Sequence, residues 1–391
     1  MKSNSTSETK CSKYVLSKRR KDQPSKSLLH SNTGELVLDG VHVAKKRIRQ
    51  ELHIEHGNQH ILAALGIKSH TAVIEESLPI VDLFCCIGGY STGATQAGHR
   101  IVLAVDNDPI ALGIHAANHP DAVHRVMTLG PETQDELVRE IRAALPPGCV
   151  RWHLHGSPPC TFLSAMRNAC HHPNRTAEKL AENEELGMAM VNWYLDFVEK
   201  MNPTTFSFEQ VNHKEVRETL WDRMRSKRMW DFEIVKMWEY GVPQTRTRII
   251  GGTRALVDRL RFDQTLRVAT PTTIRQVVTP PENAMYIVSY WDRLADFSQT
   301  EEDGKGGFVN PEAEGRARTL DEPCWTQMCR SLTWWSGRFE TIRILNIGET
   351  LAIQTFPADY IFPAGTRVKD KIKGVGNAIP PLFAKKLMKI S

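Results

Sequence analysis

From Leu78 onward, short apolar segments alternate with helix-like segments, and each apolar segment runs into a loop marked by Gly or Pro. Strands that alternate with helices predict an α/β fold with a doubly wound, mostly parallel sheet. In such a sheet, ligands bind in the loops at the carboxyl ends of the strands. We therefore expect the functional groups in the loops that come after the apolar segments, which are residues 79–84, 100–106, 151–156, 204–211 and 246–252.

The alternation is interrupted between about residues 253 and 315, where Pro, Gly, Thr and charged residues dominate. Helix-like sequence resumes from Arg343. The interruption predicts a smaller inserted lobe, after which the chain returns to the main domain. We expect boundaries at 1–76 for an N-terminal extension, 77–252 for the main domain, 253–340 for the lobe and 341–391 for the return.

The N-terminal extension is strongly basic. Residues 1–50 hold 12 Lys or Arg against 4 Asp or Glu, in a chain whose net charge is +5. A basic tail of this kind is typical of an arm that contacts phosphates or directs targeting. A solvated leader without fixed structure fits residues 1–30 equally well, because they are rich in Ser and Lys. We assign no function to the strand-like and helix-like residues 34–66.

The cysteines and the hydropathy exclude several classes of protein. Eight cysteines are too few and too unevenly spread for a disulfide scaffold in 391 residues, and none forms a C-x-x-C pair. The run Cys170-His171-His172 fits no common zinc pattern, so we expect free thiols and no metal site. No run of about 18 apolar residues occurs, so no membrane span is expected and the protein should be intracellular.

Residues 82–89, with the sequence DLFCCIGG, lead from the first apolar segment into a tight turn and a helix. Glycines in such a turn allow the backbone to approach a ligand, and the helix N-terminus favours a carboxylate or phosphate. The second apolar segment ends at Asp106, where a carboxylate can accept hydrogen bonds from the ribose of a nucleoside cofactor. Each feature alone is also common in sites without a ligand.

The sequence Ser157-Pro158-Pro159-Cys160 comes directly after the third apolar segment. Two prolines restrict the backbone and hold the next side chain rigidly, as a nucleophile requires. A thiolate suits attack on an electron-poor aromatic carbon. Cys160 is therefore the candidate nucleophile.

Two further motifs place polar groups near strand ends. Glu209 ends an apolar strand, and its carboxyl group could donate a hydrogen bond to a ring nitrogen or protonate it. Residues 244–248, QTRTR, alternate as a strand does, so Gln244, Arg246 and Arg248 should share one face. Two guanidinium groups there could hold a base carbonyl oxygen or phosphates.

The order of six motifs resembles the cytosine carbon-5 DNA methyltransferase family over residues 79–390. The motifs are DLFCCIGG (82–89), SPPC (157–160), EQV (209–211), QTRTR (244–248), RTLDEPCWT (318–326) and GVGNAIPP (374–381). The resemblance implies a Rossmann-like catalytic and cofactor-binding domain with a target-recognition lobe at 253–340. It implies methyl transfer from S-adenosylmethionine to cytosine in double-stranded DNA. We also expect a monomer, with a restriction endonuclease as a counterpart.

The resemblance also implies roles for individual residues. Cys160 matches the nucleophile that adds to carbon 6 of a flipped-out cytosine, Glu209 the acid at ring nitrogen 3, and Arg248, supported by Arg246, the arginine that contacts the base. The expected cofactor residues are Asp82, Phe84, Gly88, Gly89, Asp106, Asn107 and Asn377. The expected DNA contacts are Ser164, Gln244, Arg318 and Thr326.

Three departures from the family pattern bear on these roles. Cys86 stands where the family usually has the first glycine of its cofactor loop. Gln210 replaces the usual Asn after the glutamate and has a longer reach. The family commonly has an Asp near the cofactor adenine, where this chain has Met127-Thr128. These changes concern cofactor affinity rather than the type of reaction.

Two alternatives stay open. The first is methylation of RNA, since a related branch acts on transfer RNA; that branch carries a Cys-Phe-Thr tripeptide, and residues 212–252 contain no cysteine, which favours DNA. The second is a binding protein that keeps the fold without catalysis. The short lobe predicts a DNA target of about two to five base pairs, read by groups such as Arg275, Gln276, Arg293, Arg316, Arg318 and Gln327.

Overall fold

The computed structural model describes residues 76–160, 162–163, 177–289, 317–338 and 341–390. The chain divides into two units, residues 1–69 and 70–391. All of the described residues belong to the second unit. The expected interpretation of residues 1–66 lies outside the described residues.

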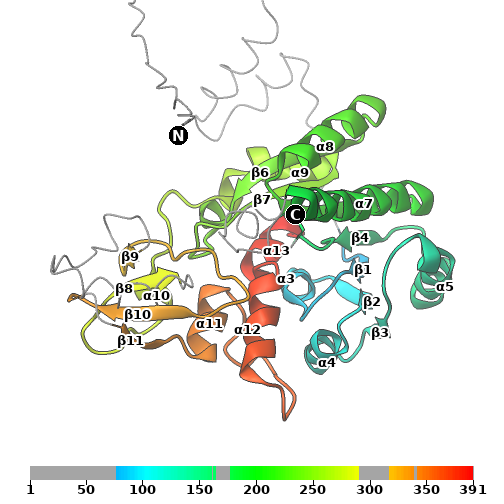
Figure 1. Ribbon diagram of the computed structural model, residues 1–391. Coiled ribbons are helices and arrows are strands. Elements are labelled where there is room, and N and C mark those ends of the chain that lie inside the picture. The colour runs from blue at the N-terminus through cyan, green and yellow to red at the C-terminus, as the bar shows by residue number, and fades with distance from the viewer. Residues whose placement is uncertain (1–75, 161, 164–176, 290–316, 339–340, 391) are drawn as a thin grey trace, which may run out of the picture. The chain divides into compact units, whose positions relative to one another are not determined.

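The larger sheet has seven strands in the order β3-β2-β1-β4-β5-β7-β6 (Figure 1). Strands β1 to β5 are parallel, and β7 is antiparallel to both β5 and β6. The mostly parallel α/β sheet predicted from the sequence is therefore confirmed. The strands are β1 (Pro79–Leu83), β2 (Arg100–Asp106), β3 (Val123–Val126), β4 (His153–Gly156), β5 (Thr205–Val211), β6 (Trp230–Lys236) and β7 (Thr247–Thr253).

The order of the strands reverses between β1 and β4. The chain adds β2 and β3 on one side of β1, then returns to place β4 and β5 on the other side. A crevice opens at the carboxyl ends of the strands where the order reverses, and ligands of such sheets bind there. The fold thus directs attention to the loops after β1 and β4.

Helices cover both faces of the sheet because alternate strand residues point to opposite sides. Val81 and Leu83 pack on one face with α5 (Gln134–Ala144), α7 (Ala177–Met201) and α8 (Lys214–Ser226). Ile80 and Ile101 pack on the other with α3 (Gly89–Gln96), α9 (Arg254–Phe262) and α13 (Pro381–Leu387). Helix α4 (Pro109–Asn118) lies beside β2 and β3, and its N-terminus is capped by Asp108.

Helix α13 lies against α3 at close range, although the two are far apart in the sequence (Figure 1). A Cβ atom added at Gly93 of α3 would lie 2.2 Å from the carbonyl oxygen of Pro381. A Cβ atom at Gly89 would meet the carbonyl oxygen of Ile379 at the same distance. The two glycines, four residues apart on one face of α3, are what allow the C-terminal segment to pack so closely.

A second, antiparallel sheet has four strands in the order β11-β10-β8-β9. Its core contains the fully buried Trp334 and includes residues of two short helices. We call residues 274–353 the small-sheet lobe. Its elements are α10 (Ile274–Val277), β8 (Ala284–Ser289), β9 (Ala317–Thr319), β10 (Leu332–Ser336), β11 (Thr341–Ile344) and α11 (Ile347–Ile353).

The lobe boundaries differ from the expected 253–340 at both ends. Helix α9 packs on β6 and β7 of the larger sheet, so residues 254–262 belong to the main domain. Strand β11 pairs with β10, so the lobe continues past residue 340. Arg343 lies in β11 rather than in a helix, because its backbone completes the antiparallel sheet.

Gln244 connects the main domain to the small-sheet lobe. Its Nε2 donates hydrogen bonds to the carbonyl oxygen of Ile353 (2.8 Å) and to Gln354 Oε1 (2.7 Å). Its Oε1 accepts a hydrogen bond from the backbone N–H of Gln327 at 2.8 Å. The side chain is fully buried, so it acts as an internal joint.

The remaining described elements are short apart from one helix near the C-terminus, and they connect the larger ones. They are η1 (Pro131–Thr133), η2 (Met237–Tyr240), η3 (Gln264–Leu266) and α12 (Val368–Asn377). Among the helices of the described residues, none combines the length and apolar character required to cross a bilayer.

Candidate active site

The loop after β4 carries Ser157, Pro158, Pro159 and Cys160 at the carboxyl end of the sheet. The Ser157 N–H donates to the carbonyl oxygen of Leu83 at 3.3 Å, which ties the loop to β1. Gln210 Nε2 donates to the carbonyl oxygen of Pro158 at 3.1 Å. The Gln210 side chain, which departs from the family pattern, thus reaches across and fixes the proline loop, and Cys160 stands half-buried at its end.

Glu209, Arg246 and Arg248 come together beside this loop. Glu209 is buried near the end of β5, and Arg248 of the antiparallel neighbour β7 places its Nε 2.9 Å from Glu209 Oε1. Arg246 lies just before β7, almost fully buried, with its Nη2 3.9 Å from the same oxygen. Arg246 and Arg248 therefore share a face as the alternation predicted, whereas Gln244 turns toward the small-sheet lobe.

Charges from these residues act on the Cys160 thiol. Burial raises the pKa of Cys160, Arg248 and Arg246 oppose this rise, and Glu209 adds to it. Burial likewise lowers the pKa of Arg246 to about 10, with Arg248 contributing. The thiol is therefore neutral at rest, and its ionisation is favoured by the two guanidinium groups.

Several buried polar atoms around Cys160 have no hydrogen-bond partner among the described residues. They are Glu209 Oε1, Arg246 Nε and Arg248 Nε, although the last forms the ion pair with Glu209. Unsatisfied buried polar atoms cost roughly 1–3 kcal/mol each. An arrangement of an unsatisfied carboxylate oxygen and guanidinium N–H groups suits a planar ligand that presents both a donor and an acceptor.

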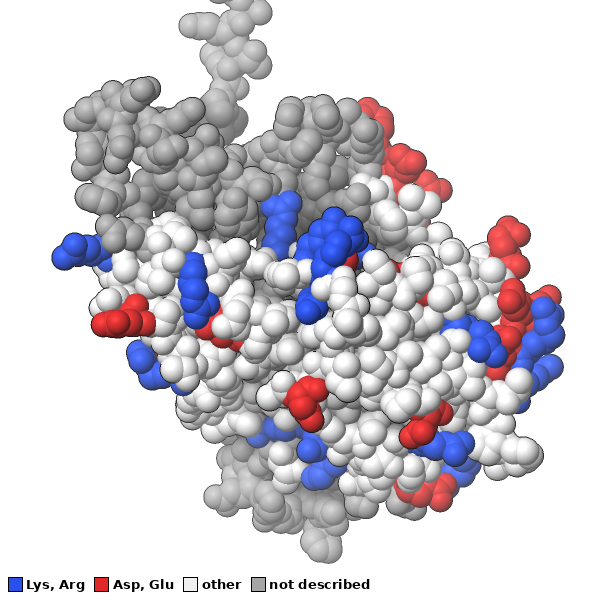
Figure 2. Space-filling model, turned by 90° about the horizontal axis from the view of Figure 1, so that it is seen from below, with Lys and Arg blue, Asp and Glu red and all other residues white. Residues whose placement is uncertain are grey.

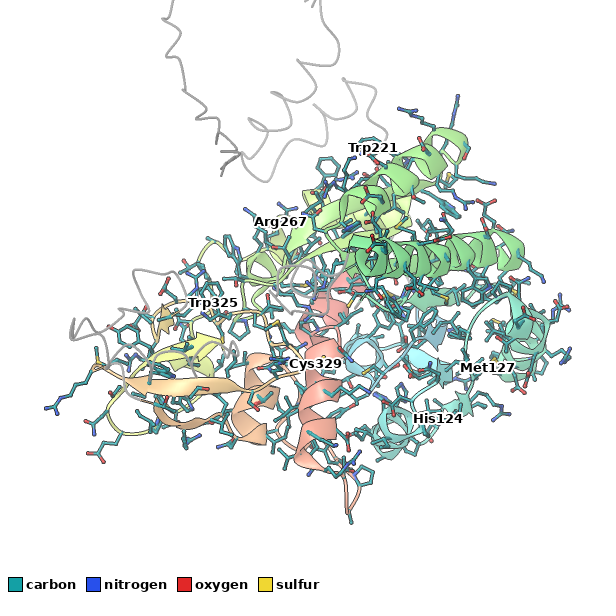
Figure 3. The ribbon with its side chains drawn as sticks, viewed as in Figure 1. His124, Met127, Trp221, Arg267, Trp325 and Cys329 are labelled. Atoms are coloured by element: carbon teal, nitrogen blue, oxygen red, sulfur yellow. The ribbon has the colours of Figure 1, made fainter. Side chains whose placement is uncertain are left out.

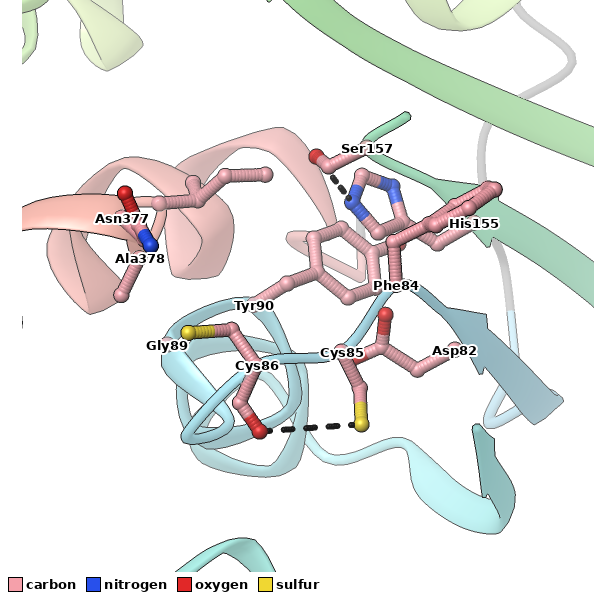
Figure 4. A pocket seen from close by; sticks show the side chains of 11 residues that line it. Asp82, Phe84, Cys85, Cys86, Gly89, Tyr90, His155, Ser157, Asn377 and Ala378 are labelled. Atoms are coloured by element: carbon pink, nitrogen blue, oxygen red, sulfur yellow. Dashed lines mark hydrogen bonds between the residues drawn. The ribbon is translucent and has the colours of Figure 1, made fainter. Parts of the chain in front are cut away.

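A pocket lies next to this cluster, at the reversal point between β1 and β4 (Figure 4). The structure brings four expected cofactor residues to its wall: Asp82, Phe84, Gly89 and Asn377. Gly88, Asp106 and Asn107 do not line it. The complete lining is Asp82, Phe84, Cys85, Cys86, Gly89, Tyr90, His155, Ser157, Asn377, Ala378 and Ile379.

Asp82 is the acidic group of the pocket. It is 1% exposed, and burial raises its pKa to about 7. Ser91 donates a hydrogen bond to Oδ2 at 2.6 Å, but Oδ1 is buried without a partner among the described residues. This oxygen can accept a hydrogen bond from a ligand, and its charge would pair with a cationic ligand group.

The turn between β1 and α3 is held by Asp106, which lies at the end of β2. Asp106 Oδ2 accepts from the Cys86 N–H at 2.8 Å and Oδ1 accepts from the Asp108 N–H at 2.9 Å. Phe84 (φ 58°), Cys86 (φ 50°) and Gly88 (φ 94°) all have left-handed backbones. Cys86 thus occupies a conformation that glycine adopts without cost, in agreement with the glycine usually found there.

Asn107 and Gly88 lie outside the pocket lining, whereas Asn377 belongs to it. Asn107 is exposed directly after β2, and Gly88 caps the N-terminus of α3. Asn377 ends α12, and its Oδ1 accepts a hydrogen bond from Cys329 Sγ at 2.8 Å, so a loop of the small-sheet lobe reaches the pocket wall (Figure 3). Met127 is buried and Thr128 is exposed after β3.

Two of the expected DNA contacts are accessible. Arg318 of β9 is half-buried; it pairs with Glu322 at 3.0 Å and stacks on Trp325 with 4.1 Å between its guanidinium carbon and the ring centroid. Thr326 is half-buried in the following loop. The expectation that Gln244 contacts DNA is corrected, because burial and internal hydrogen bonds keep its amide from DNA. Ser164 and Cys170-His171-His172 lie outside the described residues.

Charge is dispersed over the face shown in Figure 2. Basic and acidic side chains stand singly or in small groups among uncharged ones. On that face the described residues form no continuous basic surface, so their charges do not indicate where a polyanion would bind.

Sequence reasoning missed three residues of the site. Tyr90 and His155 stack in the pocket with ring centroids 3.5 Å apart and an angle of 5°. Ser157 connects the pocket to Glu209, with its Oγ 3.4 Å from Oε2. The signal that could have found His155 was the pair of histidines at alternate positions of an otherwise apolar strand, since buried histidines require polar partners.

The chain matches the family model described as C-5 cytosine-specific DNA methylase over residues 78–390. Among curated proteins it is 25% identical over 337 residues to the type II methyltransferase M1.HphI of Haemophilus parahaemolyticus, covering 79% of this chain and 85% of that one. It is 25% identical over 321 residues to M.HindV of Haemophilus influenzae, covering 78% and 93%. The family model's match over residues 78–390 contains all six ordered motifs.

Solved structures share the fold. The S. pombe Dnmt2 methyltransferase aligns with a TM-score of 0.51 at 16% identity, covering 79% of this chain and 96% of that one. The Entamoeba histolytica methyltransferase EhMeth aligns with a TM-score of 0.50 at 15% identity, covering 81% and 98%. At these identities the likeness concerns the fold alone.

Proposed function

Because this chain belongs to the C-5 cytosine-specific DNA methylase family, we propose that it transfers a methyl group from S-adenosylmethionine to carbon 5 of cytosine in double-stranded DNA, through a covalent adduct with Cys160. The observation that carries the proposal is the cluster of Glu209, Arg246 and Arg248 beside Cys160, in which ion-paired side chains keep buried polar atoms that have no hydrogen-bond partner among the described residues. The relatives named as type II methyltransferases support the DNA substrate.

In the proposed reaction Cys160 loses its proton and its sulfur adds to carbon 6 of the ring. Glu209 holds a proton at ring nitrogen 3. This proton draws electron density away from carbon 6, where the sulfur adds, and the addition then allows electron density to build up at carbon 5. Arg248 orients the Glu209 carboxylate and is close enough to contact the base carbonyl oxygen. Once carbon 5 is methylated, it loses its proton, the bond to sulfur breaks and the aromatic ring is restored.

The pocket residues fit the cofactor. The unpaired, buried Asp82 Oδ1 suits a cationic group, and the flat faces of Phe84 and Tyr90 suit the remainder of a nucleoside. Asp106 and Asn107, at the end of β2, are proposed for the ribose, with Gly88, Gly89 and Asn377 closing the pocket. When bound, S-adenosylmethionine supplies an electrophilic methyl group.

For DNA we propose contacts from Arg318 and Thr326 of the small-sheet lobe and from Ser164. The target base must leave the duplex to reach Cys160, at a cost of a few kcal/mol. Interactions of the lobe with the duplex would offset that cost. The type II methyltransferase names of the relatives support a restriction–modification context, in which the protein would be a monomer that acts beside a cognate endonuclease.

The test is covalent trapping. The purified protein is incubated with S-adenosylmethionine and duplex DNA in which 5-fluorocytosine replaces cytosine. Fluorine cannot leave carbon 5 as a proton does, so the wild type should remain attached to DNA through a denaturing gel. Cys160→Ala should give no adduct and no methylation while keeping its circular dichroism spectrum and its affinity for the cofactor. Normal turnover by Cys160→Ala would end the proposed mechanism.

The same assay separates two other functions. Transfer RNA serves as a parallel substrate, because the Dnmt2 structure shares the fold. The argument against RNA is the absence of cysteine from residues 212–252. Methylation of RNA but not DNA would favour the RNA enzyme. Cofactor binding without transfer to either nucleic acid would favour a binding protein that lacks catalysis.

A further inference from the structure

A continuous chain of polar side chains crosses the larger sheet between β4 and β5 and ends at Glu209. We call Thr205, His153, Ser207, His155 and Ser157 the polar ladder. In the paired strands β4 and β5, His153 lies opposite Thr205 and His155 opposite Ser207, and their side chains contact one another on one face of the sheet. The family motifs contain only Ser157 of this set, so methyl transfer as proposed leaves the ladder without a role.

Every link of the polar ladder lies within hydrogen-bond distance. Thr205 Oγ1 is 2.8 Å from His153 Nδ1, and His153 Nε2 is 2.9 Å from Ser207 Oγ. Ser207 Oγ is 2.7 Å from His155 Nδ1, His155 Nε2 is 3.3 Å from Ser157 Oγ, and Ser157 Oγ is 3.4 Å from Glu209 Oε2. The histidines and Ser207 are at most 1% exposed.

The direction of these hydrogen bonds is determined by their end point. A carboxylate oxygen only accepts, so the Ser157 hydroxyl donates to Glu209. Ser157 must then accept from His155 Nε2, which leaves His155 Nδ1 to accept from Ser207. By the same reasoning His153 donates from Nε2 to Ser207 and accepts from Thr205. One set of tautomers satisfies the five links of the ladder. Ser207 Oγ also lies within hydrogen-bond distance of Tyr90 Oη, at 3.3 Å, and because a hydroxyl has a single proton, the ladder requires that Ser207 donate to His155 rather than to Tyr90.

The environment keeps both histidines neutral. Burial lowers the pKa of His153 to about 3 and holds the pKa of His155 well below its usual range. The charged and titratable groups around the ladder are Tyr90 of α3, which stacks on His155, Asp82 of β1, His99 near His153, and Arg246, Arg248 and Cys160 at Glu209. A neutral imidazole that accepts at one nitrogen and donates at the other can pass a proton without holding a charge.

We propose that the polar ladder is a proton relay that loads Glu209 from the opposite end of the sheet. It rests on the proposed function. Ser157 passes its proton to Glu209 Oε2 and receives one from His155 Nε2, while Ser207 protonates His155 Nδ1. Ser207 is resupplied by His153 Nε2, Thr205 protonates His153 Nδ1, and a solvent proton restores Thr205 at the partly exposed start of β5. Glu209 then gives its proton to ring nitrogen 3 of cytosine.

The need for such a path comes from where Glu209 lies. The side chain is 4% exposed, and its oxygens face Arg248 and Ser157 rather than solvent. A base bound between Glu209 and Cys160 would cover the side of the carboxylate that faces Cys160. A proton that enters from the amino-terminal end of β5 reaches the carboxylate while the mouth of the site is occupied. Ser157, His155 and Ser207 are therefore positioning residues that act through Glu209.

The experiment compares Ser207→Ala, which breaks the ladder at its centre, with Tyr194→Phe. Tyr194 of α7 lies outside the ladder, and its Oη donates to the backbone carbonyl oxygen of Ser207 at 2.8 Å, so this control also removes a buried hydroxyl that contacts β5. Single-turnover methylation of duplex DNA is measured against pH, and in mixtures of H₂O and D₂O. Thr205→Val, a nearly isosteric change at the entrance, is the second test if Ser207→Ala unfolds.

For Ser207→Ala and Thr205→Val we expect the rate to fall about ten- to a hundredfold, since general acid catalysis contributes roughly that or more. Affinity for DNA and cofactor should not change, and the wild-type curvature of rate with D₂O fraction should be lost. Tyr194→Phe should keep the curvature. Independently of activity, ¹⁵N spectra of the wild type should show His153 and His155 as neutral tautomers protonated at Nε2.

The outcomes are separable. A wild type that forms no adduct with 5-fluorocytosine DNA overturns the proposed function and the relay with it. A wild type that forms the adduct, with Ser207→Ala or Thr205→Val matching its rate, pH profile and isotope dependence, overturns the relay alone. A His155 protonated at Nδ1 also overturns it, because the direction of the ladder would be reversed.

Discussion

At the scale of single residues, Cys86 stands where the family usually has glycine, and its backbone conformation explains why glycine is usual there. Its φ of 50° is left-handed, and its Sγ lies 3.6 Å from the carbonyl oxygen of Gly374. A side chain in this conformation costs about 1–2 kcal/mol relative to glycine. The contact with α12 stabilises the turn in return.

This balance is tested by comparing two variants that both remove the sulfur. Cys86→Gly should be more stable to urea than Cys86→Ala by about 1 kcal/mol, because only the alanine keeps the strained backbone. Equilibrium unfolding followed by circular dichroism measures the difference. Equal stability of the two variants would mean that the turn relaxes and stores no strain.

Asp82 predicts a dependence of stability on pH. Burial raises its pKa in the folded protein to about 7, against 3.8 when exposed. The folded state therefore holds this proton more tightly than the unfolded state does. The stability from Asp82 is fully present below about pH 4 and declines as the pH rises to about 7.

The free energy of unfolding of the wild type minus that of Asp82→Asn should fall by roughly 4 kcal/mol across this window and stay level above it. The asparagine keeps an acceptor for Ser91 and does not titrate, so subtraction removes the other titrating groups. Urea unfolding at intervals from pH 4.5 to 8 measures the difference. A difference that stays constant with pH would show that Asp82 is ionised throughout.

At the scale of helices and strands, the sequence predicted the parts of the sheet that are buried on both sides. Strands β1, β2, β4, β5 and β7 appear as apolar runs because helices cover both their faces. Strand β3 escaped prediction because its four residues are half-buried or exposed, and β6 because its burial is irregular. The boundaries of the small-sheet lobe were misplaced because the packing of α9 on the larger sheet and the pairing of β11 with β10 depend on distant residues.

Part of the candidate site could likewise be predicted from the sequence, and part could not. Cys160, Glu209 and the two arginines could be found because they lie at or just beyond strand ends and occur in ordered motifs. The roles of Gln244 and of the polar ladder could not be found, because each depends on partners more than 50 residues away. Pairing between distant residues is decided by the strand order, which local patterns do not contain.

The packing of α3 on α13 gives a prediction at this scale. Gly93→Ala should destabilise the protein by about 1–3 kcal/mol, because the new Cβ would overlap the backbone of Pro381. Gly113→Ala is the matched control in α4, where an added Cβ meets nothing within 4 Å. That variant should gain about 0.5–1 kcal/mol, as alanine favours a helix. Thermal unfolding of both variants measures the two changes in stability. Changes of the same sign would contradict close packing at Gly93.

At the scale of the whole molecule, the small-sheet lobe is the part proposed to choose the DNA sequence. Its core is separate from the cores on the two faces of the larger sheet, and Gln244 joins it to the segment directly before β7, which carries Arg246. A lobe with its own core can be exchanged between relatives if the joint is kept. The boundaries to use are those of the lobe itself, residues 274–353.

Exchanging residues 274–353 for those of a relative with a known target should transfer the target, expected to be about two to five base pairs, without changing the chemistry. Sequencing of modified bases in cells that express the hybrid reads the result. The same exchange with the boundaries 253–340 should give an unstable protein, because it removes α9 from the main domain and separates β11 from β10. A stable hybrid that retains the original target would place recognition outside the lobe.

The cofactor pocket joins residues 82–90 to residues 377–379, which lie about 290 positions later in the chain. A ribosome adds residues from the N-terminus, so Asp82 and Phe84 emerge long before Asn377, Ala378 and Ile379. Until the last of these has left the exit tunnel, one wall of the pocket does not exist. The pocket of a nascent chain can therefore bind a ligand only after residue 379 has been translated and has left the tunnel.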